Sequence, residues 1–258
     1  MKLLSALKLY KKRYIDSYTE LDESGTRLMV NSFLSEILGF TPIEEIKTEY
    51  MIKGTYADYM IQTGGIRHFL VEVKALSLEL SDKHLRQTIN YGANEGIEWA
   101  LLTNGRSFDF YKILFNQPIE SRKIFSINLS DSSQLKNQVE LLQYLHKDAI
   151  TRKSLKLLWN RCEALFPMSI ASILYSSEVV NTIKKLIRNK YGEKCEEGDI
   201  IKTLNEIVSG RMDPCSIKPY KPARKELKGI KIPKPKTLIT PEVTNVETVT
   251  EVISPQLN

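Results

Sequence analysis

The chain lacks the short motifs that mark several common enzyme classes. Its 258 residues contain no G-x-S-x-G elbow, no H-E-x-x-H helix and no G-x-G-x-x-G turn, which argues against serine hydrolases, zinc proteases and dinucleotide-binding enzymes. No G-x-x-x-x-G-K-[S/T] phosphate loop occurs, so an ATP-driven motor is not expected of this chain. The three histidines, His68, His84 and His146, have no metal-ligand spacing and are interpreted as ordinary surface residues.

Cysteines and long apolar runs are also scarce. Cys162, Cys195 and Cys215 lie far apart, with neither CxxC spacing nor the even number of a disulfide framework, and they fit a reducing cytoplasm. No stretch approaches the roughly 18 consecutive apolar residues of a membrane helix, so no membrane partner is expected. The opening MKLLSALKLYKKRYIDSY has no small-residue cleavage site, and we interpret it as the start of a helix or strand rather than a signal peptide.

Positive charge is concentrated towards the end of the sequence. The formal net charge is +6, and residues 211–236 alone contain nine Lys or Arg against two acidic residues. A basic segment suggests an anionic partner such as nucleic acid, because Lys and Arg release counterions when they approach phosphates. A solvated tail that keeps the chain in solution is the alternative interpretation.

The pattern of apolar residues predicts a mixed α/β domain over residues 1–148, with a central β-sheet flanked by helices. Gly39 and Gly96 are expected to end helices, and Ser81 to begin one. In chain order we expect a helix over 26–38, an irregular stretch after Pro42, strands over 57–61 and 66–76, a helix over 82–94, strands at WALLT, SFDFYKI and KIFSINL, and a helix from about Ser132 to His146.

The remaining sequence predicts two further segments. Residues 149–210 show only helical periodicity and are expected to form a small helical domain. One of its helices places Lys184, Lys185, Arg188 and Lys190 near one another. This suggests a DNA-binding or oligomerisation module, with DNA contacts at Lys184, Lys185 and Arg188, and a merely solvated helix face is the alternative. Residues 211–258 are expected to form a disordered Lys/Pro-rich tail.

The hairpin ADYMIQTGGIRHFLVEVKA carries charges where a buried strand is expected. Since side chains alternate between the two faces of a strand, Glu72 and Lys74 share a face. If the hairpin turns near Gly65, Asp58 lies opposite Glu72, and their carboxylates repel one another. Lys74 offsets one of these charges, and a hard divalent cation offsets more. A solvent-exposed strand face is the simpler alternative.

Mg²⁺ suits this arrangement because it prefers oxygen ligands and commonly uses one or two carboxylates, with water and phosphate oxygens in its other positions. We therefore expect Asp58 and Glu72 to bind Mg²⁺, with Mn²⁺ as a substitute. Lys74 is expected to stabilise the negative charge that develops at a phosphate or to align the attacking water.

The order of residues in this region resembles the PD-(D/E)XK nuclease superfamily, and more closely the nuclease domain at the start of the restriction subunit of type I restriction enzymes. The resemblance spans about residues 18–112, less than half of the chain. In that family an Asp precedes a Glu-x-Lys strand, a Q-x-x-x-Y helix and a strand that ends in T-N-G. Ala57 replaces the proline that often precedes the Asp, and the ATP-driven motor of the restriction subunit has no counterpart here. The matching residues are Asp58, Glu72, Lys74, Gln87, Tyr91 and Thr103 to Gly105.

The resemblance implies further roles. An acidic residue of the first helix completes the metal site, and Glu23 matches it best, with Glu20 and Asp22 as rivals. Gln87 orients the substrate or Lys74, and Tyr91 contacts DNA. We also expect a DNA contact at Arg106 in the LLTNGR turn.

Two hypotheses follow from the sequence. The first is a Mg²⁺-dependent DNA endonuclease of restriction or phage and plasmid defence. The second is a non-catalytic DNA-binding subunit of a restriction or repair complex that acts through a partner. Both have DNA as a partner, together with methyltransferase, specificity or motor subunits, and both leave a homodimer open.

Overall fold

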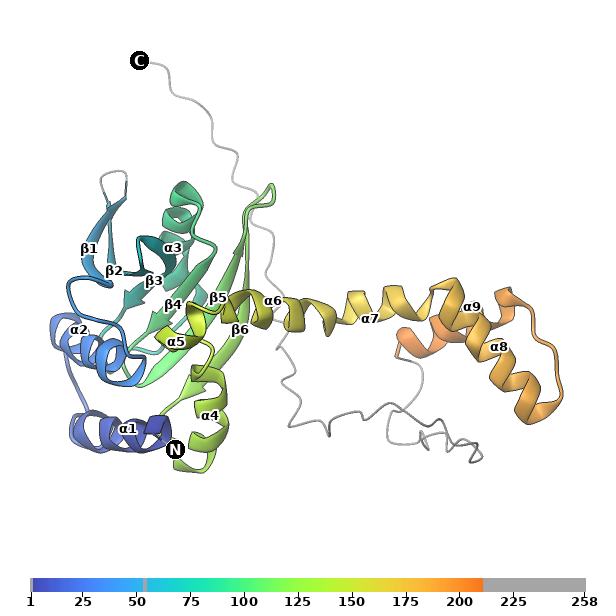
Figure 1. Ribbon diagram of the computed structural model, residues 1–258, viewed down its shortest axis with the longest axis horizontal. Coiled ribbons are helices and arrows are strands. Elements are labelled where there is room, and N and C mark those ends of the chain that lie inside the picture. Colours follow the sequence, from blue (N-terminus) through green and yellow to red (C-terminus); the bar gives the residue numbers. More distant parts are fainter. Residues whose placement is uncertain (1, 53–54, 211–258) are drawn as a thin grey trace, which may run out of the picture. The chain divides into compact units, whose positions relative to one another are not determined.

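The computed structural model describes residues 2–52 and 55–210 of the chain, without the side chains of a few of these residues (Figure 1). The chain divides after Leu155 into two compact units. The predicted tail over residues 211–258 lies outside the described residues. The elements of the first unit are α1 (Lys2–Tyr10), π-helix η1 (Lys11–Ile15), α2 (Glu23–Ser32), π-helix η2 (Phe33–Ile37), β1 (Ile46–Ile52), β2 (Thr55–Thr63), β3 (Ile66–Val73), α3 (Asp82–Glu95), β4 (Trp99–Thr103), β5 (Ser107–Leu114), β6 (Glu120–Asn128), 3-10 helix η3 (Ser132–Gln134), α4 (Leu135–Leu142) and α5 (Lys147–Ile150).

The described strands form one six-stranded sheet in the order β1-β2-β3-β4-β5-β6. All neighbours are antiparallel except β3 and β4, which are parallel. A parallel pair needs a crossover connection, and α3 supplies it between these two strands (Figure 1). The predicted mixed α/β fold with a central sheet is thus confirmed.

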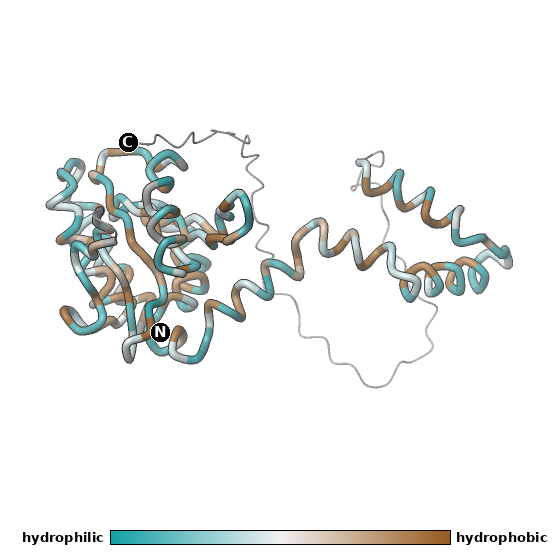
Figure 2. Tube along the Cα trace, turned by 90° about the horizontal axis from the view of Figure 1, so that it is seen from above, coloured by the Kyte–Doolittle hydropathy of each residue, from teal (hydrophilic) through white to brown (hydrophobic). Residues whose placement is uncertain are grey.

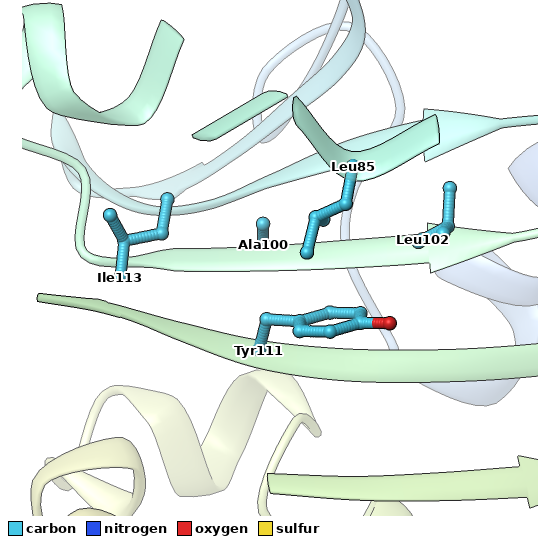
Figure 3. Packing of buried hydrophobic residues seen from close by; sticks show 5 residues of the cluster. All are labelled: Leu85, Ala100, Leu102, Tyr111 and Ile113. Atoms are coloured by element: carbon cyan, nitrogen blue, oxygen red, sulfur yellow. The ribbon is translucent and has the colours of Figure 1, made fainter. Parts of the chain in front are cut away.

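The two faces of the sheet are covered by different helices. On one face Leu85 of α3 packs on Ala100, Tyr111 and their neighbours, and Figure 3 shows the Tyr111 ring lying along β5 below Leu85. On the other face Phe108 of β5 stacks on Phe33 of η2, with ring centroids 4.1 Å apart.

The boundaries of α3 follow the sequence signals. Ser81 is the N-cap residue and forms a capping box with His84. Gly96 ends the helix in the left-handed conformation, with φ of 66°, which glycine adopts without steric cost.

Strand β1 was not predicted, and the expectation of an irregular stretch after Pro42 is wrong for residues 46–52. This strand lies at the edge of the sheet, and among the described strands it pairs with β2. Its sequence alternates Ile46, Thr48 and Tyr50 with Lys47 and Glu49, which is the pattern of a half-buried strand. The sequence therefore contained the signal for β1. Among the side chains described in β1, only that of Ile46 is fully buried.

The second unit, described to residue 210, is helical, as the periodicity of residues 149–210 predicts. Figure 2 shows hydrophobic residues recurring along its helices. Helices α8 and α9 pack around Val180, Ile200 and Leu204. None of the helices among the described residues is long and apolar enough to cross a membrane. The unit contains most of α6 (Ser154–Ala164), α7 (Pro167–Leu174), which was not predicted, α8 (Ser177–Tyr191) and α9 (Glu197–Val208).

The T-N-G turn between β4 and β5 connects three parts of the first unit. The Asn104 side-chain amide donates to the Leu78 carbonyl at 2.8 Å. The Tyr10 hydroxyl of α1 donates to the Gly105 carbonyl at 3.1 Å. Gly105 has a φ of 77°, and a Cβ atom at this position would lie 2.9 Å from Cε of Met29 in α2. The turn therefore requires glycine for both its conformation and its space.

We expect Gly105→Ala to destabilise the protein by about 2–4 kcal/mol, because the left-handed conformation and the contact with Met29 both penalise a Cβ atom. Gly64→Ala is the matched control, since Gly64 also has a positive φ but a Cβ atom added there would meet open space within 4 Å. Its cost is expected to be about 1 kcal/mol. Urea unfolding measures both variants, and equal costs would show that the contact with Met29 is unimportant.

Candidate active site

The antiparallel pairing of β2 and β3 determines where the charged side chains of the hairpin lie. Tyr59 pairs with Val71 and Met60 with Leu70. Continuing this register by one residue sets Asp58 opposite Glu72 on the same face of the sheet, as the sequence predicts. Both carboxylates are buried, with relative exposures of 8% and 6%.

Asp58 lies at the end of the β2–β3 pairing that is remote from the turn. Its Oδ2 atom accepts a hydrogen bond from the Val73 backbone N–H at 2.7 Å, and its Oδ1 atom lies 2.5 Å from Nη2 of Arg27 in α2. Burial raises the pKa of Asp58 above its ordinary value, and it outweighs the Val73 N–H and the Arg27 charge, which both lower that pKa. The carboxylate is therefore fixed in position but incompletely compensated.

Glu72 and Lys74 form a direct pair, with 2.7 Å between Oε1 and Nζ. The Thr88 hydroxyl of α3 lies 3.4 Å from Oε2 of Glu72. Burial raises the pKa of Glu72 and the nearby Asp58 charge adds to this, although the Lys74 hydrogen bond lowers it. Burial alone would lower the pKa of Lys74, but Glu72, Glu23 and Asp58 together raise it. Nearby carboxylates thus raise both pKa values, although burial is the largest cause of the raised pKa of Glu72.

Helix α2 supplies a third carboxylate. Glu23, in its first turn, lies 3.0 Å from Nη2 of Arg27 and 4.0 Å from Nζ of Lys74. Asp22 is the N-cap residue and accepts a hydrogen bond from the Gly25 N–H at 2.7 Å. Glu20 is exposed and precedes the helix. Of the three acidic residues considered from the sequence, Glu23 is the one that contacts both cations of the site.

The five side chains form one continuous chain of ion pairs. It runs from Asp58 to Arg27, from Arg27 to Glu23, from Glu23 to Lys74 and from Lys74 to Glu72. Three carboxylates face two cations, so one negative charge is uncompensated when all five groups are ionised. In a half-buried setting this excess favours binding of a further cation.

The remaining predicted residues are placed as follows. Gln87 and Tyr91 lie on α3, but their side chains are outside the described part of the structure. Arg106 lies in the turn after β4, and Nη2 of its guanidinium is 3.5 Å from the Tyr18 carbonyl. Lys184, Lys185 and Arg188 lie on α8 in the second unit, whereas the ion-pair chain belongs to the first unit.

Sequence reasoning did not assign a role to Arg27 or Thr88. Arg27 follows Glu23 by four residues, a spacing that places both on one face of α2. Thr88 is fully buried and follows Gln87 directly. The helical spacing was the available signal for Arg27, whereas the contact of Thr88 with Glu72 depends on how α3 packs on β3 and β4.

The donor set agrees in type with a hard divalent cation, because buried carboxylates from adjacent strands and a third from a helix are oxygen ligands. In the structure their oxygen atoms are directed at Arg27, Lys74 and the Val73 N–H. Over the described residues, no group of three or more His, Cys, Asp or Glu side chains has the geometry of a metal site. Asp58, Glu72 and Glu23 are the residues that would hold a cation.

Residues 22–122 match the family of the type I restriction enzyme R protein N terminus (HSDR_N). The match covers α2, the hairpin, α3 and strands β4 and β5, and it confirms the resemblance that the motifs indicate. No curated protein and no solved structure matches the chain.

The excess charge gives a prediction for Glu72→Gln, which preserves the shape and removes the charge. Because the folded chain raises the pKa of Glu72, ionisation costs stability as pH rises from the ordinary value of a Glu towards that raised pKa. The variant should therefore melt at a higher temperature than the unmodified protein at pH 7 in EDTA. At pH 4 or below the two should melt alike, since Glu72 is protonated in both states. A variant that melts lower at pH 7 would contradict the excess-charge interpretation.

Proposed function

We propose that the chain is a Mg²⁺-dependent DNA endonuclease of a restriction or phage and plasmid defence system. The observation that carries the proposal is the convergence of Asp58, Glu72 and Lys74 at one end of the β2–β3 hairpin, inside the segment that matches the restriction-enzyme family. A substrate phosphate beside this group meets an ammonium ion and buried carboxylates at once.

Each residue has a distinct role in the proposed reaction. Asp58 and Glu72 would hold the cation, and Glu23 would complete the acidic set through a water molecule. When bound, Mg²⁺ supplies an activated water and neutralises phosphate charge. The ammonium group of Lys74, fixed by its pair with Glu72, stabilises the negative charge that builds on the phosphate oxygens. The raised pKa of Lys74 keeps it protonated for this role.

Other residues are proposed to bind the substrate. Gln87 and Tyr91 are one helical turn apart on α3, and we assign them to orientation of DNA or of Lys74. Arg106 lies beyond the end of β4, three residues after Thr103, whose carbonyl accepts the Lys74 backbone N–H at 2.8 Å. Lys184, Lys185 and Arg188 are proposed as phosphate contacts of the second unit. Partners would include methyltransferase, specificity or motor subunits.

Cleavage of supercoiled plasmid DNA in the presence of Mg²⁺ tests the proposal. We expect Lys74→Ala to reduce the cleavage rate roughly 100-fold or more, because the developing phosphate charge loses its nearest cation. Lys12→Ala is the matched control, since Lys12 is an exposed lysine of η1 outside the ion-pair chain. Equal cleavage rates for Lys74→Ala and the unmodified protein would refute the assignment of Lys74.

A non-catalytic DNA-binding subunit is the second candidate. It is favoured by the engagement of all three carboxylates with side-chain cations, an arrangement that holds together without a metal ion. Gel-shift and nicking assays on the same DNA separate the two functions. The second candidate predicts binding that weakens steeply as salt increases, with no nicking in Mg²⁺ or Mn²⁺. The first predicts nicking that EDTA abolishes.

A further inference from the structure

Arg27 occupies a central position in the ion-pair chain. Its Nη2 atom lies 2.5 Å from Oδ1 of Asp58 and 3.0 Å from Oε1 of Glu23. One guanidinium nitrogen thus joins a carboxylate on β2 to a carboxylate on α2. Joining oxygen atoms from separate elements is also what a divalent cation does at a site of this composition.

The carboxylate of Asp58 is held independently of Arg27. The Val73 backbone N–H donates to its other oxygen atom at 2.7 Å, and backbone atoms of a paired strand do not move readily. The Arg27 side chain is 36% exposed, and its two ion pairs with the site are made by its charged end. The fixed partner is therefore the acid, and the movable partner is the guanidinium.

One hydrogen-bond donor of the Arg27 guanidinium also lacks an acceptor. Its Nε atom is buried and has no hydrogen-bond partner in the structure. A buried donor without a partner destabilises the arrangement that contains it. The backbone of Arg27 is held separately, because the Tyr59 hydroxyl donates to its carbonyl at 2.6 Å. Burial raises the pKa of Tyr59 to about 12, so this hydroxyl remains a donor at physiological pH.

We propose that Arg27 is an exchangeable counter-cation of the acidic site. It bridges Asp58 and Glu23 in the metal-free protein and releases Asp58 when a divalent cation binds, while its backbone stays in place. Arg27 is thus a positioning residue that sets the cation affinity of the site. This inference rests on the proposed function, because it requires a cation to bind at Asp58 and Glu72.

The test is the affinity of the intact chain for Mn²⁺ without DNA, measured by electron paramagnetic resonance and calorimetry. Because Arg27 and the metal ion compete for the same carboxylate, Arg27→Gln should bind Mn²⁺ roughly two- to tenfold more tightly than the unmodified protein. Arg27→Lys keeps the charge and should bind less tightly than Arg27→Gln. Arg13→Gln is the matched control, since Arg13 forms an exposed ion pair with Glu36 at 3.1 Å outside the site. The Mn²⁺ affinity of this variant should equal that of the unmodified protein.

A merely structural role for Arg27 predicts a different result. Loss of a structural contact lowers Mn²⁺ affinity or leaves it unchanged, and either outcome for a folded Arg27→Gln protein overturns the inference. Glu72→Gln identifies the binding site in the same assay, because it should weaken Mn²⁺ binding. If the unmodified protein binds no Mn²⁺, or binds it equally after Glu72→Gln, the metal site of the proposed function fails and this inference fails with it.

The unmodified protein supplies a second measurement, which holds even if Arg27→Gln does not fold. The Nε–Hε resonance of Arg27 should shift during a Mg²⁺ titration, with the same midpoint as cation binding measured by calorimetry. The resonance of Arg13 should not shift. A constant Arg27 resonance at saturating Mg²⁺, with calorimetric binding present, overturns the exchange and leaves the proposed function standing.

Discussion

The hydrogen bond from the Val73 N–H to the Asp58 carboxylate is the contact on which the rest of the site depends. At this point the ladder between β2 and β3 ends, and a side chain rather than a backbone carbonyl satisfies the next donor. Asp58 is thereby fixed to Val73, the residue between Glu72 and Lys74. Two carboxylates that repel each other are held together because one of them completes the hydrogen bonding of the sheet.

The negative charges of Asp58 and Glu72 lie close together, and side chains from three regions of the chain contact them. Arg27 reaches Asp58 from α2, Lys74 reaches Glu72 from the end of β3, and the Thr88 hydroxyl approaches from α3. Glu23 then adds a negative charge between the two cations. A site built only for stability would gain from omitting Glu23, since a neutral residue there would balance the charges of the other four. Its presence leaves the five ionised side chains with one negative charge in excess.

Much of this arrangement could be predicted from the sequence, and the reasons differ from residue to residue. The common face of Asp58, Glu72 and Lys74 follows from strand alternation and the short TGG turn, both of which are local. The ends of α3 follow from Ser81 and Gly96. Strand β1 could also have been predicted, because Lys47 and Glu49 alternate with Ile46, Thr48 and Tyr50. The Arg27 bridge depends on the angle at which α2 meets the hairpin, which no local pattern contains.

The family motif itself separates into residues that act at the site and residues that support it. Thr103, Asn104 and Gly105 contact no carboxylate of the site, but they connect the end of β4 to the loop at Leu78 and to α1. Lys74 is fixed through the same region, because its backbone N–H donates to the Thr103 carbonyl. The position of the Lys74 backbone thus depends on the end of β4, where residues 103–105 have no proposed catalytic role. The motif is spread over 48 positions, from Asp58 to Gly105. It describes three neighbouring interior strands and the helix α3 between two of them, rather than one cluster of reacting groups.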